Sequence, residues 1–171
     1  MRKLVCMAVA LLVISGNVFL VFADTIATSA DGTVINYYEH GQERPVLVFV
    51  HGWSCDASYW KEQIEYFKEK YRMVLIDLAG HGRSGSEREN YTMEAFGQDV
   101  KAVVENIGAE KAVLIGHSMG ALVIAETARL MPEKDSCTVW EFSFASVPVF
   151  KIKSVPRIIR ENRGALLGGT L

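Results

Sequence analysis

The chain has 171 residues, half of them hydrophobic and 22% charged, which excludes a disordered chain, a collagen-like repeat and a coiled coil. Its length suggests one domain or part of one, and its formal net charge of −2 gives no reason to expect a nucleic-acid partner. Three cysteines are too few for a disulfide scaffold and too scattered for a zinc site.

The N-terminus has the pattern of an export signal. Arg2 and Lys3 precede an uncharged apolar segment, and Val21–Ala23 places small residues where signal peptidase requires them. We therefore predict that residues 1–23 are a signal peptide and that the protein is exported, to the periplasm or outside the cell. The alternative is an uncleaved membrane anchor at residues 4–22, because that run is almost long enough to span a bilayer.

Beyond this segment, strand and helix patterns alternate along the chain. The predicted strands are 25–29, 33–39, 45–50, 72–76 and 111–115, and the predicted helices are 57–70, 93–107 and 119–131. Asp31-Gly32 is typical of a hairpin turn, Thr92 suits a helix cap, and Pro132 ends the last helix. Because continuous apolar strands alternate with helices, we predict an α/β fold with a mostly parallel sheet and helices on both faces.

Two of the predicted helices have an apolar side. The first is expected to line the core with Tyr59, Trp60, Ile64 and Phe67. The second carries Phe96, Val100, Val103, Val104 and Ile107 at helical spacing, and Gly108 is a natural stop after it. Between them, the polar and Gly-rich residues 78–91 are predicted to form a loop.

The most specific feature is the segment Gly116-His117-Ser118-Met119-Gly120. It matches G-x-S-x-G and lies between a predicted strand and a predicted helix, as that motif requires. Such a turn brings the residues two before and two after the serine together, so side chains there would clash. The strained serine backbone projects its hydroxyl out of the sheet, beside a helix N-terminus that favours an oxyanion. We therefore predict that Ser118 is a catalytic nucleophile; the alternative is a turn that matches by chance.

A second segment, His51-Gly52-Trp53, follows the first buried strand. The backbone N–H of Trp53 can pair with that of Met119 to form an oxyanion hole. Read alone, His51-Gly52 would be a strand-ending turn. Its place one strand–helix–strand unit before the Ser118 turn favours the oxyanion role.

Three segments in this order and spacing resemble the α/β-hydrolase superfamily. They are His51-Gly52-Trp53, Asp77-Leu78-Ala79-Gly80-His81-Gly82-Arg83-Ser84 and Gly116-His117-Ser118-Met119-Gly120. The resemblance covers about residues 25–133. It implies an eight-stranded sheet, a nucleophile at Ser118, oxyanion donors at the amides of Trp53 and Met119, an ester-like small-molecule substrate, and neither cofactor nor metal.

One motif in the same region suggests a different chemistry. Residues 80–85 read G-x-G-x-x-G after a strand, which is the pattern of a dinucleotide site. Such a site needs a helix that opens at the last glycine, facing the pyrophosphate. The polar segment 86–90 follows instead and brings two carboxylates, so we predict a loop and no nucleotide.

The triad partners of the serine are missing from the sequence. A serine needs a histidine base held by an acid, and in this superfamily both come after the serine. No histidine follows Ser118, and none of the later acids follows a convincing strand; these acids are Glu126, Glu133, Asp135, Glu141 and Glu161. We therefore predict that 24–133 is the N-terminal part of a hydrolase domain with impaired turnover. Residues 134–171 are then a divergent tail, made by a frame change or a premature end.

The alternative function is a non-catalytic exported binding or scaffold protein that retains the sheet. Its basic segment 151–163 would then touch an anionic membrane or an acidic partner, unless it is simply a solvated terminus. Without later strands, the strand at 111–115 would keep an unpaired apolar edge, which predicts self-association.

The remaining reactive side chains have plainer interpretations. We expect His117 to pack and His81 to make a hydrogen bond within its loop. Cys55 and Cys137 would remain after signal cleavage, and the sequence leaves open whether they pair. The identity of the substrate is also left open.

Overall fold

The computed structural model describes residues 11–14, 17–20, 25–132 and 138–142. Its strands are β1 Leu11–Ile14, β2 Asn17–Leu20, β3 Thr25–Thr28, β4 Val34–His40, β5 Val46–Val50, β6 Arg72–Ile76, β7 Ala112–His117 and β8 Thr138–Phe142. Its helices are the 3₁₀ helix η1 Ala57–Trp60 and the α-helices α1 Lys61–Phe67, α2 Met93–Asn106 and α3 Met119–Leu130. The predicted strands are all present, within one or two residues at their ends.

Six strands form one sheet in the order β3-β4-β6-β5-β7-β8. The hairpin β3–β4 is antiparallel and β4 joins β6 antiparallel, whereas β6, β5, β7 and β8 run parallel to one another. Val50 lies opposite Ile76 on one side and Gly116 on the other, so these three strands end at the same edge. The predicted fold class is therefore confirmed.

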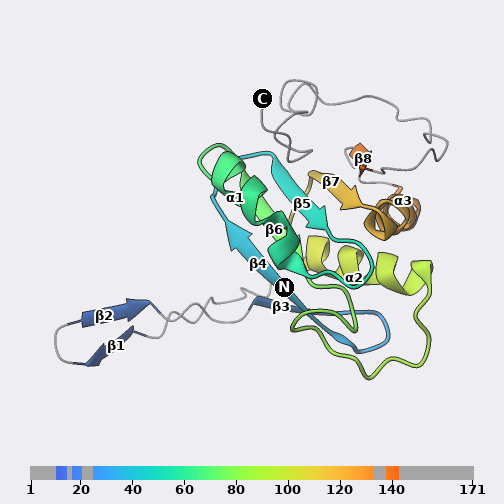
Figure 1. Ribbon diagram of the computed structural model, residues 1–171, viewed down its shortest axis with the longest axis horizontal. Helices are drawn as coiled ribbons and strands as arrows, with labels where there is room; N and C mark the ends of the chain where they lie inside the picture. The colour runs from blue at the N-terminus through green and yellow to red at the C-terminus, as the bar shows by residue number, and fades with distance from the viewer. Residues whose placement is uncertain (1–10, 15–16, 21–24, 133–137, 143–171) are drawn as a thin grey trace, which may run out of the picture.

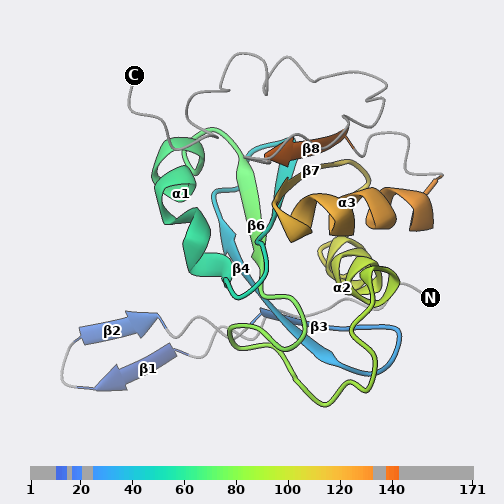
Figure 2. The same cartoon turned by 45° about the vertical axis from the view of Figure 1, so that its right-hand side comes forward.

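Helices cover both faces of the sheet (Figure 1). In the view of Figure 2, α1 lies on one side of the strands and α2 and α3 lie together on the other. The caps are as predicted: the Thr92 hydroxyl accepts a hydrogen bond from the amide of Ala95 at 3.1 Å, and Gly108 has a φ of +64° just after α2.

The two-sided covering explains why β5 is apolar at every position. Leu47 and Phe49 pack with Trp60 and Phe67 on the α1 side. Val46, Val48 and Val50 belong to the core on the α2 and α3 side. Because alternate side chains of a strand point to opposite faces, a strand covered on both faces must be apolar throughout.

One prediction about the sheet edge is wrong. We expected the strand at 111–115 to have an unpaired outer edge, but β8 pairs with β7 in parallel register, with Leu114 opposite Val139. The sequence obscured β8 because residues 138–142 follow the polar segment 133–137 and fall where the family pattern is lost. The rest of the predicted tail, including Cys137, lies outside the described residues. Cys55 has no disulfide partner among the residues that the structure describes, so its pairing with Cys137 stays open.

The first predicted helix also differs from expectation. It begins as η1, capped by Asp56, whose carboxylate accepts a hydrogen bond from the amide of Ser58 at 2.8 Å. This change of winding turns Tyr59 outward, where it is 43% exposed, although we expected it to line the core. Trp60 and Phe67 are buried as predicted.

Two short strands lie within the predicted signal segment. β1 and β2 pair antiparallel, with Leu11 opposite Leu20. Among the residues that the structure describes, no helix has the length and apolar character to cross a membrane. Cleavage after residue 23 and the alternative anchor at 4–22 both stay predictions.

A buried ion pair ties the hairpin, the long loop and α2 together. Arg88 and Asp99, whose side chains are 2% and 0% exposed, form two hydrogen bonds of 2.5 and 3.0 Å. The Ser29 hydroxyl also donates to Asp99, at 2.6 Å. Hydrogen bonds from Arg88 are the main reason that the pKa of Asp31 is lowered to about 2. Three segments far apart in sequence therefore depend on one guanidinium.

We predict that Arg88→Met lowers the free energy of unfolding by about 3–5 kcal/mol, because it leaves the Asp99 carboxylate buried without its cation. Urea denaturation measures the change. Arg129→Met is the matched control, since Arg129 pairs with Glu126 on the exposed side of α3 and should cost at most about 1 kcal/mol. Equal losses in the two variants would contradict the prediction.

Candidate active site

Ser118 occupies a strained turn between β7 and α3. Its φ is +51° and its ψ is −118°, a conformation that residues with side chains rarely adopt. The side chain is exposed and makes no capping hydrogen bond to the helix. The hydroxyl is therefore displayed at the edge of the sheet, beside the first turn of α3.

The flanking glycines are required by close contacts. A Cβ at Gly116 would lie 2.5 Å from the backbone carbonyl of Gly120. A Cβ at Gly120 would overlap the carbonyl oxygens of Val50 and His51. These contacts confirm the prediction that side chains at the two glycine positions of G-x-S-x-G would clash. They also show that the turn packs directly on the end of β5.

The loop after β5 lies beside the serine. A Cβ at Gly52 would be 3.2 Å from the Cβ of Ser118 and 3.0 Å from Nδ1 of His117. The structure therefore brings together the two segments that carry the amides of Trp53 and Met119. Their role as oxyanion donors stays a prediction.

His51 holds the loop in place, a role that the sequence analysis missed. Its fully buried ring donates from Nδ1 to the carbonyl of Gly52 at 2.8 Å, and Nε2 accepts from the amide of Leu78 at 3.1 Å. Because carbonyl and amide of a trans peptide point in opposite directions, the N–H of Trp53 points away from the His51 ring. Burial lowers the pKa of His51, so the ring is neutral at pH 7, as both hydrogen bonds require.

Asp77, at the end of β6, organises the neighbouring loops. Its carboxylate accepts from the amide of Ala57 at 2.7 Å, the amide of Arg83 at 2.9 Å and the hydroxyl of Tyr38 at 3.1 Å. Gly82 has no room for a side chain because a Cβ there would overlap this carboxylate. This role of Asp77 was missed in the sequence analysis. The pattern that could have revealed it is an acidic residue directly after a buried strand and before a Gly-rich loop.

Aromatic rings surround the serine turn. His117 stacks on Tyr59 with ring centroids 4.4 Å apart, and its buried Nδ1 has no hydrogen-bond partner among the described residues. Burial lowers the pKa of His117. The ring of His81 meets Trp53 edge-on, with centroids 5.7 Å apart, and its Nδ1 donates to the carbonyl of Ala79 at 3.0 Å.

A cavity of about 320 Å³ opens next to the Gly52 loop. Trp53, which is 66% exposed, forms one wall, and His81 and Tyr91 form others. Gly80 lets Tyr91 approach, because a Cβ at Gly80 would lie 2.9 Å from the tyrosine ring. The stretch 80–85 is thus a loop that builds this wall and is followed by no helix opening at Gly85, as predicted.

The described acids after Ser118 include Glu126 on α3. Glu126 accepts three hydrogen bonds from Arg129, which lower its pKa, so it serves as half of a surface ion pair.

Within the part of the chain that the structure describes, no three His, Cys, Asp or Glu side chains are grouped to hold a metal ion.

Comparison with known proteins matches residues 45–138 to the alpha/beta hydrolase fold family. The chain is 40% identical over 100 residues to a bifunctional esterase/perhydrolase of Acinetobacter calcoaceticus, which covers 57% of this chain and 36% of that protein. It is similar in structure to a thermophilic esterase from Thermogutta terrifontis, with a TM-score of 0.58, 30% identity and coverage of 63% and 40%. An epoxide hydrolase from an endophytic Streptomyces gives a TM-score of 0.60, 31% identity and coverage of 68% and 35%. The chain thus spans less than half the length of each.

We predict that the protein loses stability as the pH falls below about 6.5. The pKa of His51 is lowered in the folded state, so the unfolded chain binds the extra proton first, near its ordinary value of about 6.5. The contribution of neutral His51 to the free energy of unfolding is therefore fully present above that pH and is lost below it. Thermal melts between pH 8 and pH 5 measure the decline.

The variant His51→Asn should flatten this pH dependence while lowering stability at pH 7. His40→Asn is the comparison, since burial also lowers the pKa of His40, but that ring is only partly buried. The prediction is contradicted if His40→Asn flattens the profile more than His51→Asn does.

Proposed function

The chain belongs to the α/β-hydrolase fold family, and from that premise we propose that it carries the nucleophile and oxyanion site of an enzyme that hydrolyses an ester-like small molecule. One observation carries the proposal: Ser118 is exposed at positive φ on the strand-to-helix turn, against Gly52. Backbone strain costs stability, so its presence at an exposed serine indicates a functional role for that residue.

The proposed reaction is acyl transfer to water. Oγ of Ser118 attacks the substrate carbonyl carbon, and the amides of Trp53 and Met119 donate to the developing oxyanion. Collapse of this intermediate expels the alcohol and leaves an acyl group on Ser118. Water then attacks the acyl carbonyl, releases the carboxylate and restores the serine.

The nucleophile itself favours acyl chemistry over epoxide opening, although both esterases and an epoxide hydrolase are similar to the chain. Attack of a serine oxygen on an epoxide carbon would form an ether, which has no carbonyl for water to attack. An acyl ester on Ser118 is readily hydrolysed. Turnover through a serine therefore requires a carbonyl substrate.

Within these 171 residues no histidine follows Ser118, so the usual acceptor of the hydroxyl proton is not among them. For these residues alone, solvent or buffer would remove the proton, which makes acylation slow. Where a complete triad is removed from a serine hydrolase, about 10³–10⁴-fold acceleration over water survives through the oxyanion hole and binding. We propose a reduced activity of this kind for the chain.

The second candidate is a binding or scaffold protein that keeps the sheet without turnover, and it applies to the 171 residues taken alone, in which no histidine follows Ser118. Self-association through a sheet edge would then use β8, which is one of the two outer strands of the described six-stranded sheet, the other being β3.

For either function we propose export through residues 1–23. Mass spectrometry of the protein from its native host tests this, since a mature N-terminus at Asp24 is expected and an intact Met1 would contradict it.

We predict that imidazole accelerates covalent labelling of Ser118 by a fluorophosphonate probe. Added imidazole supplies the base that the sequence lacks, so labelling should be slow in phosphate buffer and rise at least about tenfold at high imidazole concentration. Intact-protein mass spectrometry reports the adduct, and Ser118→Ala is the control. Rapid labelling without imidazole would contradict the proposed impaired activity. The absence of labelling even with imidazole would contradict the proposal that Ser118 is the nucleophile.

A second substitution tests the oxyanion loop separately. Gly52→Ala places a methyl group 3.2 Å from the Cβ of Ser118 and should push the loop away from the serine. We expect imidazole-assisted labelling to fall by about tenfold or more, because losing one oxyanion donor costs about 10²–10³ in rate. The measurement is paired with a thermal melt of the same variant. An unchanged labelling rate in a folded Gly52→Ala protein would remove the loop from the mechanism.

A further inference from the structure

The α1 side of the sheet contains a cavity away from Ser118. It has a volume of about 580 Å³ and lies between α1 and β4. No residue of β7 or α3 lines it, so it is separate from the serine turn and from the cavity at Trp53. Its size falls in the range of about 300–1,000 Å³ that is typical of small-molecule sites.

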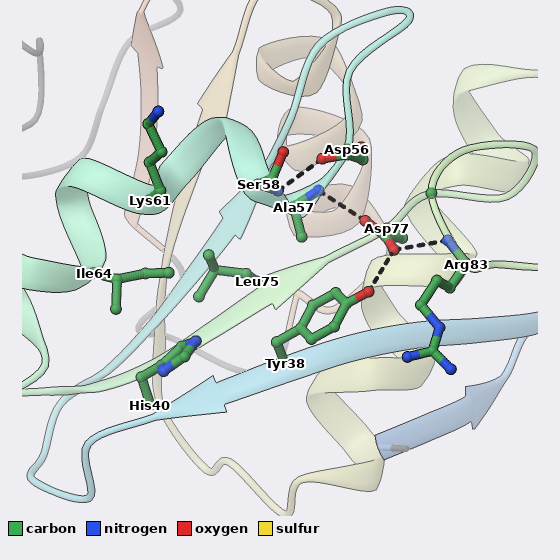
Figure 3. A pocket seen from close by; sticks show the side chains of 11 residues that line it. Tyr38, His40, Asp56, Ala57, Ser58, Lys61, Ile64, Leu75, Asp77 and Arg83 are labelled. Atoms are coloured by element: carbon green, nitrogen blue, oxygen red, sulfur yellow. Dashed lines mark hydrogen bonds between the residues drawn. The ribbon is translucent and has the colours of Figure 1, made fainter. Parts of the chain in front are cut away.

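The cavity has an apolar interior. Leu75 of β6, 1% exposed, lies behind it, with the ring of Tyr38 on one side and Ile64 of α1 on the other. Figure 3 shows these side chains and His40 around the space between the helix and β4.

The walls are held together by one buried side chain. The three hydrogen bonds of Asp77 join η1 through Ala57, the long loop through Arg83 and β4 through Tyr38. Figure 3 draws all three around the carboxylate. The walls therefore do not have to be ordered when a ligand binds, which reduces the entropic cost of binding.

The polar groups of the cavity favour an anionic ligand. Both of its carboxylates already accept hydrogen bonds from the chain, Asp77 from three donors and Asp56 from the amide of Ser58. Lys61 makes no ion pair with any other residue that the structure describes. Its ammonium group can therefore donate to the carboxylate of a ligand.

We propose that this cavity is a binding site, distinct from Ser118, for a small amphiphilic carboxylate. The apolar body lies on Leu75 between Tyr38 and Ile64, and the carboxylate accepts hydrogen bonds from Lys61. The site does not depend on the proposed hydrolase chemistry, because none of these residues belongs to the serine turn.

Calorimetric titration with 2-naphthoate tests the site. We expect saturable 1:1 binding with a Kd of about 1 mM, the strength usual for a ligand of this size. Lys61→Glu should weaken binding at least about tenfold, and an acid is tolerated there because Lys61 is the first residue of α1. The matched control is Lys68→Glu at the other end of α1, which lies outside the cavity and should change Kd by less than about twofold.

Further variants separate this site from the active site. Ile64→Trp fills the cavity and should abolish binding in a protein whose thermal melt shows it folded, whereas Ser118→Ala should leave binding unchanged. Loss of binding in Ser118→Ala, or no effect of Lys61→Glu, would overturn the proposal. Neutral 2-naphthamide or cationic 2-naphthylmethylamine binding more tightly than 2-naphthoate would overturn the choice of an anion, and no saturation by 10 mM naphthoate would overturn the site itself.

Discussion

The register between β5 and β7 is the constraint on which the site depends. Val50 lies opposite Gly116, so the segments that leave these two strands, His51–Trp53 and His117–Met119, emerge side by side at one edge of the sheet. A slip of one residue would turn every side chain of β5 to the other face, and both faces are packed. The register is therefore held by the whole core, and the close packing of Gly52 and Gly120 against the opposite segment follows from it.

Buried polar side chains then fix the loops that the sheet alone would leave free. His51 orients the Gly52 carbonyl, Asp77 holds the long loop to η1 and β4, and the pair of Arg88 and Asp99 anchors the far end of the same loop to α2. Each group is buried and fully partnered, so each makes one loop conformation much more favourable than its alternatives. The wall at His81 and Tyr91 therefore depends on contacts that Asp77 and Arg88 make outside the serine turn.

The sheet carries two separate cavities with different chemistry. The cavity lined by aromatic rings lies at the carboxyl edge near the strained serine, whereas the cavity that contains Lys61 lies on the α1 side. Asp77 links the two, since one carboxylate shapes the loop beside Trp53 and also joins the walls of the second cavity. Occupation of either cavity can stabilise the same loop, because both depend on the position of residues 78–83.

The sequence by itself determined the strand and helix order, the parallel fold class, the Ser118 turn and the caps at Thr92 and Gly108. These depend on local patterns: apolar runs, glycine spacing and capping residues that act over a few positions. Only the tertiary structure decided the pairing of β8 with β7, the outward position of Tyr59, the buried roles of His51 and Asp77, and the second cavity. Each of those depends on contacts between segments distant in sequence, and a pattern of neighbouring residues contains no information about which distant surface will cover it.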